Sequence, residues 1–400
     1  MIPINANAFT FPFTFINESA EKVIPELMGY GFSGVNLALN YHGSRDLLLR
    51  QGVQLKYLVD GFHYYKCDQS MYEKGALIPA KSSQYSDNKL IETVIKTAKT
   101  NDFKINAWAV YMHNSAIGME NPDATVTNVF GNRFLSELCP INPSVLKYAI
   151  GLTKDLCNRG ISAITAESLH FHGARHGEHH ERFFIQLSPI SEFLFSLCFC
   201  TYCKDNFNEN GFESDLLANK VKLKLQGVFD SQDPWIGKEL SKEILGEIIG
   251  PEILDYLNCR ENKLAQTYKA IVAVCNSFDV TFKFVDQSPL LDMESVTATE
   301  NSWQVGVDNM QLKKIVDFYE PLLYRPSAEQ VAYLAKDYLT HTGKNLTAIL
   351  RPTYPDSTTT DNLVDKVSKL RELEVSNIDF YLLDTMRASD LESIKHSINK

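Results

Sequence analysis

A short apolar run, an acid and a polar loop follow one another in Ile161-Ser-Ala-Ile-Thr-Ala-Glu167-Ser-Leu-His170-Phe-His172-Gly. Five of the ten histidines lie in the eleven positions from 170 to 180. An apolar run of this length that ends in an ionisable residue is typical of a barrel strand that delivers a side chain to the barrel mouth. Side chains that titrate near neutral pH are seldom packed this densely for structural reasons alone. We therefore place the candidate site at the end of this strand.

Strand-like runs and helical patterns alternate along the chain, which favours a parallel sheet with helices outside it. Five helical patterns separate neighbouring strands, at 18–30, 87–100, 144–158, 327–342 and 360–374. The eight strand candidates are 8–15, 34–39, 104–112, 162–166, 280–285, 316–322, 346–350 and 378–383. This pattern predicts an α/β fold, a (β/α)8 TIM barrel that spans residues 1–400 as a single domain.

Two insertions interrupt the regular order of strands and helices. Residues 43–86 are rich in Tyr, Gly and Lys, and we expect a long loop or hairpin over the barrel mouth. Residues 187–279 contain at least two long helical patterns, at 239–249 and 252–275. A doubly wound open sheet, or two domains divided near residue 240, would contradict the prediction of one barrel.

Composition narrows the classes of partner. The formal net charge is −10, the sequence pI is about 5.5, and basic residues are dispersed, so we expect no nucleic acid or anionic membrane as partner. The chain begins without a secretory signal pattern, and no apolar stretch approaches the 18 or so residues of a membrane span. Eight cysteines in 400 residues are too few for a disulfide scaffold. We expect a cytoplasmic, soluble protein, and association into a homo-oligomer is left open.

Polar residues follow three neighbouring strands of the predicted barrel. The ends of parallel barrel strands meet at one mouth, so the side chains there are candidates for contact with a substrate. The candidate substrate-binding residues are His42, Arg45, Trp108, His113, Asn114, His170, His172, His180 and Glu181.

Glu167 is the candidate catalytic acid. It follows Ile164-Thr-Ala at the end of the fourth strand, where partial burial would raise the pKa of its carboxyl group toward that of a general acid. The alternative is a structural acid that only bonds a neighbouring arginine or a backbone N–H group.

Cys198-Phe-Cys200-Thr-Tyr-Cys203 is spaced for three thiolates to share one tetrahedral metal ion. Cys139, before a proline, is a good candidate for the fourth ligand. In a reducing compartment such a cluster holds zinc more often than it forms disulfides. We expect a structural zinc site, and the alternative is a set of buried free cysteines.

Several motifs between residues 108 and 203 resemble those of one family. They are Trp108-Ala-Val-Tyr-Met-His-Asn114, Leu138-Cys-Pro-Ile-Asn-Pro143, Ala166-Glu-Ser168, His176-Gly-Glu-His-His-Glu181 and Leu197-Cys-Phe-Cys-Thr-Tyr-Cys203. Together they resemble an uncharacterised group of glycoside-hydrolase-like TIM barrels and, more distantly, the family 42 β-galactosidases of clan A. The resemblance implies a structural zinc on Cys139, Cys198, Cys200 and Cys203, and the acid/base role for Glu167.

The chain departs from the family 42 β-galactosidases at three places. Ala166 stands where an asparagine normally precedes the acid, and the histidine-rich loop has no counterpart. The seventh strand ends in Arg351 and carries no glutamate where clan A has its nucleophile. A second catalytic carboxylate would then come from elsewhere, with Asp286 as first choice. The other candidates are Glu320, Asp384 and Glu181.

Three functions follow from these patterns. The leading one is a glycoside hydrolase with a carbohydrate substrate, catalytic Glu167 and Asp286, and no organic cofactor. The second is a metal-dependent hydrolase or isomerase whose ligands would be His170, His172, His176 and His180. The third is a barrel that binds a saccharide without turnover. Metal analysis distinguishes the second from the others.

Overall fold

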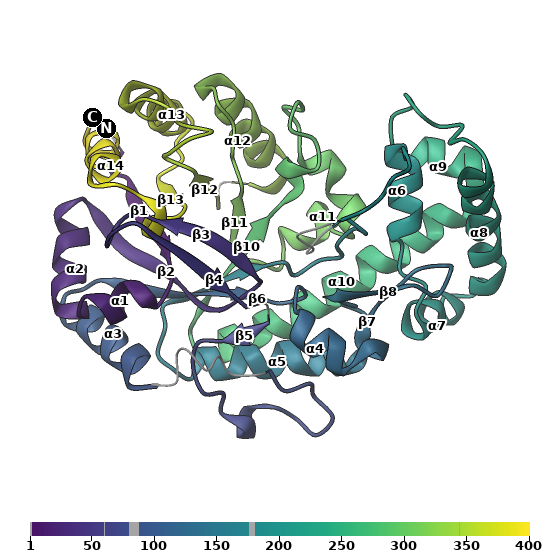
Figure 1. Cartoon of the computed structure of the whole chain (residues 1–400), viewed down its shortest axis with the longest axis horizontal. Helices are drawn as coiled ribbons and strands as arrows, with labels where there is room; N and C mark the ends of the chain where they lie inside the picture. Colours follow the sequence, from purple (N-terminus) through teal and green to yellow (C-terminus); the bar gives the residue numbers. More distant parts are fainter. Residues whose placement is uncertain (1, 60, 80–87, 176–180, 344) are drawn as a thin grey trace.

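The computed structural model describes residues 2–59, 61–79, 88–175, 181–343 and 345–400. Eight parallel strands lie side by side in the order β11-β10-β9-β6-β2-β1-β13-β12, and two parallel bridges, Tyr319 to Leu346 and Leu322 to Ile349, join the first strand of this order to the last. The strands are β1 (Asn5–Thr10), β2 (Phe32–Tyr41), β6 (Lys104–Val110), β9 (Ala163–Glu167), β10 (Thr281–Asp286), β11 (Phe318–Pro321), β12 (Thr347–Leu350) and β13 (Asn377–Phe380). The predicted (β/α)8 barrel is confirmed (Figure 1).

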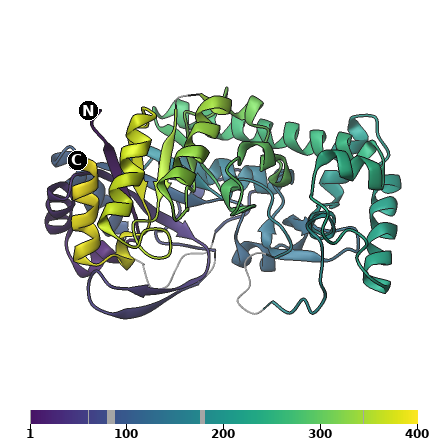
Figure 2. The same ribbon diagram turned by 90° about the horizontal axis from the view of Figure 1, so that it is seen from above.

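Helices surround the barrel, as Figures 1 and 2 show. They are α2 (Ala20–Gly29), α3 (Asn88–Thr100), α5 (Pro143–Cys157), α10 (Glu252–Ser277), the short α11 (Asn309–Leu312), α12 (Ala328–Thr342), α13 (Thr360–Glu372) and α14 (Ala388–Asn399). Local capping explains where several of them begin. The Asn142 side chain accepts a hydrogen bond from the Ser144 N–H group at the start of α5, and Ser327 forms a capping box with Gln330 at the start of α12.

The first and last strands end earlier than the apolar runs suggested. The run expected as strand 8–15 ends at Thr10, and α1 (Phe13–Asn17) follows. Pro12 explains this, since its backbone lies in the helical region at φ −59° and ψ −25°. The last expected strand, 378–383, ends at Phe380 and is followed by a 3₁₀ turn, η5 (Leu383–Thr385).

The first insertion forms an antiparallel hairpin of β3 (Ser44–Leu48) and β4 (Gln54–Leu58), and then β5 (Phe62–His63), which pairs with β2. Buried Leu48 and Leu58 belong to the same apolar cluster as Tyr41 and Trp108, so the hairpin packs against the barrel mouth. A second excursion, which no sequence pattern indicated, holds α4 (Ser115–Glu120) and the hairpin β7 (Thr125–Thr127) and β8 (Arg133–Leu138).

The second insertion is a helical lobe beside the barrel, on the right of Figure 1. It contains α6 (Pro189–Ser196), α7 (Thr201–Glu209), α8 (Ser214–Asp230) and α9 (Lys242–Ile249). The 26-residue α10 belongs to both parts. Its first half, with Tyr256 and Leu257, packs in the apolar cluster of the lobe, and its second half, with Tyr268 and Ile271, packs in the core of the barrel.

A layer of polar side chains crosses the interior of the barrel. Asp379 on β13 accepts hydrogen bonds from Asn7 on β1 and Asn36 on β2, both at 2.7 Å. Lys283 Nζ on β10 lies 2.9 Å from Glu320 Oε1 on β11 and 3.8 Å from Asp379 Oδ2. The two carboxylate side chains are 0% exposed. One lysine, whose side chain is 11% exposed, therefore serves two buried acids.

Two further strands join this layer through Asn36. Asn106 on β6 donates a hydrogen bond to Asn36 Oδ1 at 2.8 Å, and Thr165 on β9 donates to the same oxygen at 3.4 Å. Burial raises the pKa of Glu320 to about 7, with Lys283 opposing this shift and Asp379 adding to it. Among the described residues, no helix has the length and the apolar composition that crossing a bilayer takes.

We expect Lys283→Met to destabilise the barrel, because it removes the cation between Glu320 and Asp379. Breaking a buried ion pair in this way costs about 3–5 kcal/mol in the free energy of unfolding. The loss should shrink as the pH falls. Because the folded-state pKa of Glu320 is raised to about 7, its protonated form is the one that burial favours, and this contribution to stability is lost as the pH rises through 7.

Urea denaturation of the variant and the wild type at pH 8 and pH 5 measures this effect. Lys336→Met, on the exposed side of α12, is the matched control and should change stability little. A loss of less than about 1 kcal/mol at pH 8 would contradict a structural role for the Lys283 charge.

Candidate active site

Glu167 ends β9 with its carboxylate in the barrel mouth and its side chain 13% exposed. Trp108 Nε1 donates a hydrogen bond of 2.5 Å to Oε2, and Gln287 Nε2 donates one of 3.5 Å to Oε1. His42 Nε2 lies 3.8 Å from Oε1. Burial raises the pKa of Glu167, while His42 and the Trp108 hydrogen bond act in the opposite direction. The carboxyl group thus keeps its proton to higher pH than an exposed glutamate does.

Aromatic rings form the wall beside Glu167. Trp108 lies edge-on to Tyr41, with ring centroids 4.5 Å apart, and to Tyr381, with centroids 5.8 Å apart. The hydroxyl groups of Tyr41 and Tyr381 lie 3.0 Å from each other. Tyr324 stands next to Tyr381, with ring centroids at 6.0 Å. Aromatic faces with a few polar tips suit a ligand that has both apolar and hydroxylated sides.

The histidines from three strand ends form a row of rings. The rings of His42 and His113 stack, with centroids 5.0 Å apart and planes inclined by 11°. His113 lies 6.1 Å from His172, which lies 4.4 Å from His170. Burial lowers the pKa of His113 to about 3, with His42 adding to the shift, and burial also lowers the pKa of His170. The two buried rings are therefore neutral at pH 7 and act as hydrogen-bonding groups.

The remaining candidate binding residues belong neither to the aromatic wall nor to the row of histidine rings. Asn114 is buried and caps α4, where its side chain accepts a hydrogen bond from the Ile117 N–H group at 2.9 Å. Arg45 is exposed on β3, and Glu181 is exposed at the start of the segment that leads to α6. His176 and His180 fall outside the described residues.

Asp286 lies on the outer face of its strand. Tyr338 on α12 donates a hydrogen bond of 2.7 Å to its Oδ2, and the Ser288 N–H group donates one of 2.8 Å to its Oδ1. Its neighbour Val285 instead belongs to the apolar cluster inside the mouth. Successive strand residues point to opposite faces, so Asp286 points to the helix layer and not toward Glu167. These contacts are those of a structural carboxylate.

Glu320 and Asp384, two of the other sequence-predicted carboxylates, are also engaged away from Glu167. Glu320 belongs to the polar layer below the mouth. Asp384 accepts hydrogen bonds from Thr10 at 3.1 Å and from the Phe11 N–H group at 2.9 Å, and burial raises its pKa to about 6. It fixes the turn that follows β1.

Sequence patterns missed two acids at the mouth. Asp46 lies on the β3 hairpin, where burial raises its pKa and His42 opposes the shift. Asp356 follows β12 and is 7% exposed, with Arg351 Nη1 3.0 Å from its Oδ2. Burial raises the pKa of Asp356 above its usual value, and the positive charge of Arg351 opposes part of this shift. The signal in the sequence was Arg351-Pro-Thr-Tyr-Pro-Asp356, an acid six residues beyond the strand end at Leu350.

The four candidate zinc ligands converge. Cys139 Sγ lies 3.6 Å from Cys203 Sγ, 3.8 Å from Cys198 Sγ and 3.7 Å from Cys200 Sγ, and all four sulfurs lie within 4.8 Å of one another. All four residues are buried. A tetrahedral ion with Zn–S bonds of about 2.3 Å sets its sulfurs about 3.8 Å apart, so the donor set and its spacing fit zinc.

A cavity of about 560 Å³ opens beside the mouth. Its walls come from the loop after β9, from α6 and α10, and from the segments that follow β10. Gln287 lines this cavity and also contacts Glu167, so the cavity adjoins the carboxylate.

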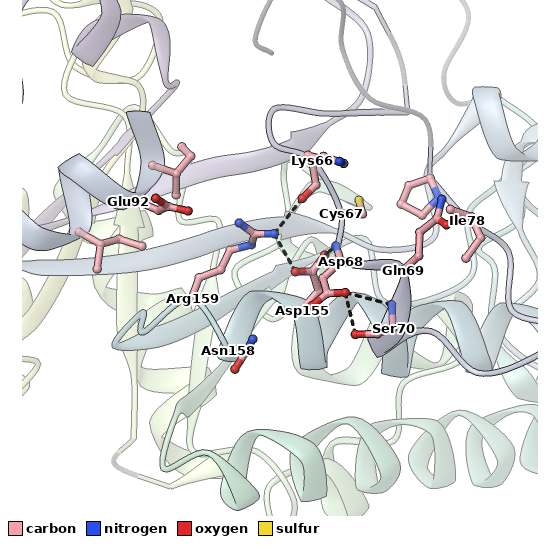
Figure 3. Close-up of a pocket in the computed structure, with 13 residues that line it drawn as sticks. Lys66, Cys67, Asp68, Gln69, Ser70, Ile78, Glu92, Asp155, Asn158 and Arg159 are labelled. Atoms are coloured by element: carbon pink, nitrogen blue, oxygen red, sulfur yellow. Dashed lines mark hydrogen bonds and ion pairs between the residues drawn. The ribbon is translucent and has the colours of Figure 1, made fainter. Parts of the chain in front are cut away.

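A larger cavity of about 820 Å³ lies outside the barrel, beside α3 and α5 (Figure 3). Arg159 Nη2 donates hydrogen bonds there to Asp155 at 2.8 Å and to the Lys66 carbonyl at 3.0 Å. Cys67 Sγ lies 3.3 Å from His63 Nδ1, but burial raises the pKa of Cys67 to about 12 and lowers that of His63 to about 3. A thiol that stays protonated is a poor nucleophile, so this pair carries no cysteine chemistry.

Solved structures share this architecture. The glycoside hydrolase domain of PgaB (BpsB) from Bordetella bronchiseptica matches with a TM-score of 0.59 and 12% identity, over 99% of this chain and 99% of that chain. A β-galactosidase from the psychrophilic Marinomonas ef1 matches with a TM-score of 0.57 and 8% identity, over 99% of this chain and 59% of that chain. An α-L-fucosidase, isoenzyme 2, from Paenibacillus thiaminolyticus matches with a TM-score of 0.55 and 10% identity, over 100% of this chain and 49% of that chain.

No family model matches the sequence, and no curated protein is similar to it in sequence. The chain spans 59% of the length of the galactosidase and 49% of the length of the fucosidase. At these identities the likeness shows the fold, a TIM barrel of the kind found in glycoside hydrolases. The resemblance expected from the sequence motifs is confirmed at that level.

We expect the Glu167 carboxyl group to titrate above the ordinary glutamate value of about 4.3. His42→Gln should raise its midpoint further, because the substitution removes a group whose positive charge favours the carboxylate. Carbon-13 NMR of protein labelled at glutamate side chains measures the midpoint, with Glu167→Gln to assign the signal. His396→Gln, on an exposed position of α14, should leave it unchanged. A midpoint at or below 4.3, or one that falls in His42→Gln, would show that burial does not dominate.

Proposed function

We propose that the protein is a glycoside hydrolase in which Glu167 is the general acid/base. The observation that carries the proposal is the environment of that carboxylate. It ends the fourth barrel strand, its pKa is raised by burial, and an aromatic wall stands beside it. A raised pKa is what a proton donor needs near neutral pH, and aromatic faces stack on sugar rings.

The contacts of Glu167 assign a task to each of its neighbours. The protonated carboxyl gives its proton to the glycosidic oxygen as the bond from the anomeric carbon to that oxygen breaks. The Trp108 N–H group holds Oε2, which fixes the plane of the carboxyl group. The carboxylate left behind is stabilised by the same hydrogen bond and by His42. If the second carboxylate forms a covalent bond to the anomeric carbon, Glu167 then accepts a proton from the water that displaces it; if the second carboxylate is instead a base, that carboxylate takes the proton of the attacking water.

Asp46 and Asp356 are the candidates for the second carboxylate of this mechanism. Both lie at the mouth, and burial raises the pKa of each. Asp356 has the stronger support, since it follows the seventh strand and is held by Arg351. The turnover of Asp46→Asn and Asp356→Asn identifies which of the two acts.

The metal-dependent alternative has less support in the part of the chain that the structure describes. There, the one group of side chains placed to hold a metal ion is the cysteine cluster. His170 and His172 lie close to each other, while His176 and His180 are outside the described residues. A saccharide-binding barrel without turnover remains the other alternative, and it predicts binding of sugars with no hydrolysis.

We also propose that the cysteine cluster holds a structural zinc ion. Cys139 follows β8, and the other three cysteines lie at the start of α7, so the ion would join the segment after β8 to the helical lobe. Its four positions would all be filled by protein sulfur, which leaves none for a substrate.

Glu167→Gln tests the catalytic proposal. Turnover of glycosides with poor leaving groups should fall by about 10²–10⁴, the usual contribution of general acid catalysis. The loss should be smaller for nitrophenyl glycosides, whose leaving groups need little protonation. Steady-state kinetics on a panel of methyl and nitrophenyl glycosides measures both effects. Glu120→Gln, exposed on α4, is the control and should retain activity. Full turnover of a methyl glycoside by Glu167→Gln would remove Glu167 from the mechanism.

Removal of the metal tests the zinc proposal. The purified protein should contain about one zinc per chain, and Cys198→Ser should lose that zinc and lower the melting temperature, because metal binding and folding are coupled. Elemental analysis and thermal unfolding measure the two effects. Cys67→Ser, outside the cluster, should keep its zinc. Wild-type protein without bound metal that is equally stable in chelator would show that these are free cysteines.

A further inference from the structure

The cavity beside the mouth is largely apolar and contains few charged groups. Its lining includes the rings of Phe171, Phe193 and Phe195 and the charged side chains of Arg175, Glu192 and Arg260. Arg175 Nε lies 2.8 Å from Glu192 Oε1, and both of these side chains are 39% exposed. These two charges therefore neutralise each other at the rim.

Arg260 on α10 is the remaining cation, and it is 3% exposed. Its guanidinium carbon lies 4.2 Å from the ring centroid of Phe171. Its Nε and Nη1 atoms are buried without a hydrogen-bond partner among the described residues. A guanidinium group stays charged in proteins. Glu261 and the thiolates of Cys198 and Cys203 lie near enough to favour that charge, but they leave the two buried N–H groups without an acceptor, which is costly. The side chain is thus prepared to receive an anion.

The position of the cavity relates this cation to the catalytic carboxylate. Gln287 lines the cavity and donates a hydrogen bond to Glu167 Oε1 at 3.5 Å. His170, from the loop after β9, lines the cavity next to it. A saccharide with its glycosidic oxygen at Glu167 would place a neighbouring unit in the cavity. A volume of about 560 Å³ is enough for that unit, since pockets for small ligands run from about 300 to 1,000 Å³.

We propose that this cavity is a subsite for an acidic sugar unit whose anionic group binds Arg260. This inference rests on the proposed glycoside hydrolase function, and it adds a substrate class. Arginine binds carboxylate and sulfate oxygens through paired N–H groups, and the aromatic lining covers the sugar ring. The anion is the carboxylate of a uronic acid or a sulfate ester, which share this chemistry.

Binding to the wild-type protein provides the first test, which needs no hydrolysis. Calorimetry with glucuronate, glucose 6-sulfate and glucose should show at least ten-fold tighter binding for one of the two anions than for glucose. The tighter of the two identifies the anionic group. The preference should weaken as the salt concentration rises, because an ionic contact is screened. Equal binding of all three sugars would overturn the proposal even if no variant folds.

Arg260→Met provides the second test, since it keeps much of the side-chain length and removes the charge. The preference for the anion should be lost, and Arg260→Lys should recover part of it. The matched control is the double variant Arg175→Met/Glu192→Gln, which removes the rim ion pair without changing the net charge and should keep the preference. If Arg260→Met kept the preference but lost zinc, the arginine would only balance the nearby Cys198 and Cys203 thiolates, and the proposal would be wrong.

The two proposals fail in different ways. If Glu167→Gln loses turnover while the wild type binds acidic and neutral sugars equally, the hydrolase stands and the acidic subsite is wrong. If the anion is preferred and no glycoside is hydrolysed, the subsite stands and the hydrolase is wrong. For a hydrolase with this subsite, Arg260→Met should raise KM for an acidic substrate at least ten-fold more than it raises KM for a neutral one.

Discussion

The contact among Asp379, Lys283 and Glu320 inside the barrel is the constraint on which the rest of the structure depends. Through Asn7, Asn36, Asn106 and Thr165 it links seven of the eight strands. Buried polar groups need their partners, so each strand must present its polar residue inward at this one level. A slip of one residue in any strand would turn that residue to the other face. The polar layer thereby decides which side chains reach the mouth. Trp108 and Glu167 lie two positions beyond Asn106 and Thr165 and point the same way.

The sequence was sufficient to predict the barrel and the position of Glu167. The strands are apolar runs bounded by turns, and helix caps such as Ser327 mark where helices begin. The orientation of Asp286 could not be predicted in the same way. Polar and apolar residues alternate in Thr281-Phe-Lys-Phe284, but strands of a parallel barrel are buried on both faces, so this alternation does not tell which face is the inner one. The hydrogen bond from Tyr338 shows that Asp286 faces the helix layer, and it joins residues that are 52 positions apart in the sequence.

The composition of the mouth was harder to predict than its location. Asp46 reaches it because a hairpin folds back, and Asp356 because the segment after β12 is held by Arg351. Local sequence patterns predict neither position, since both depend on packing between distant segments. The row of histidines, in contrast, could be predicted from the sequence. His113, His170 and His172 follow adjacent strands, and adjacent strands bring their ends together in any barrel of this type.

The length of α10 has a mechanical consequence. At 1.5 Å per residue, its 26 residues make a rod of about 39 Å. One end of the helix packs in the barrel core and the other in the lobe. A tilt of α10 about its barrel end would therefore move the lobe relative to the barrel. A tilt of about 5° would move the far end of such a rod by roughly 3 Å. Arg260 lies on this rod, and α6 in the lobe forms the facing wall of the cavity. A small tilt of the lobe would therefore change the width of this cavity, while Glu167 in the barrel would keep its place.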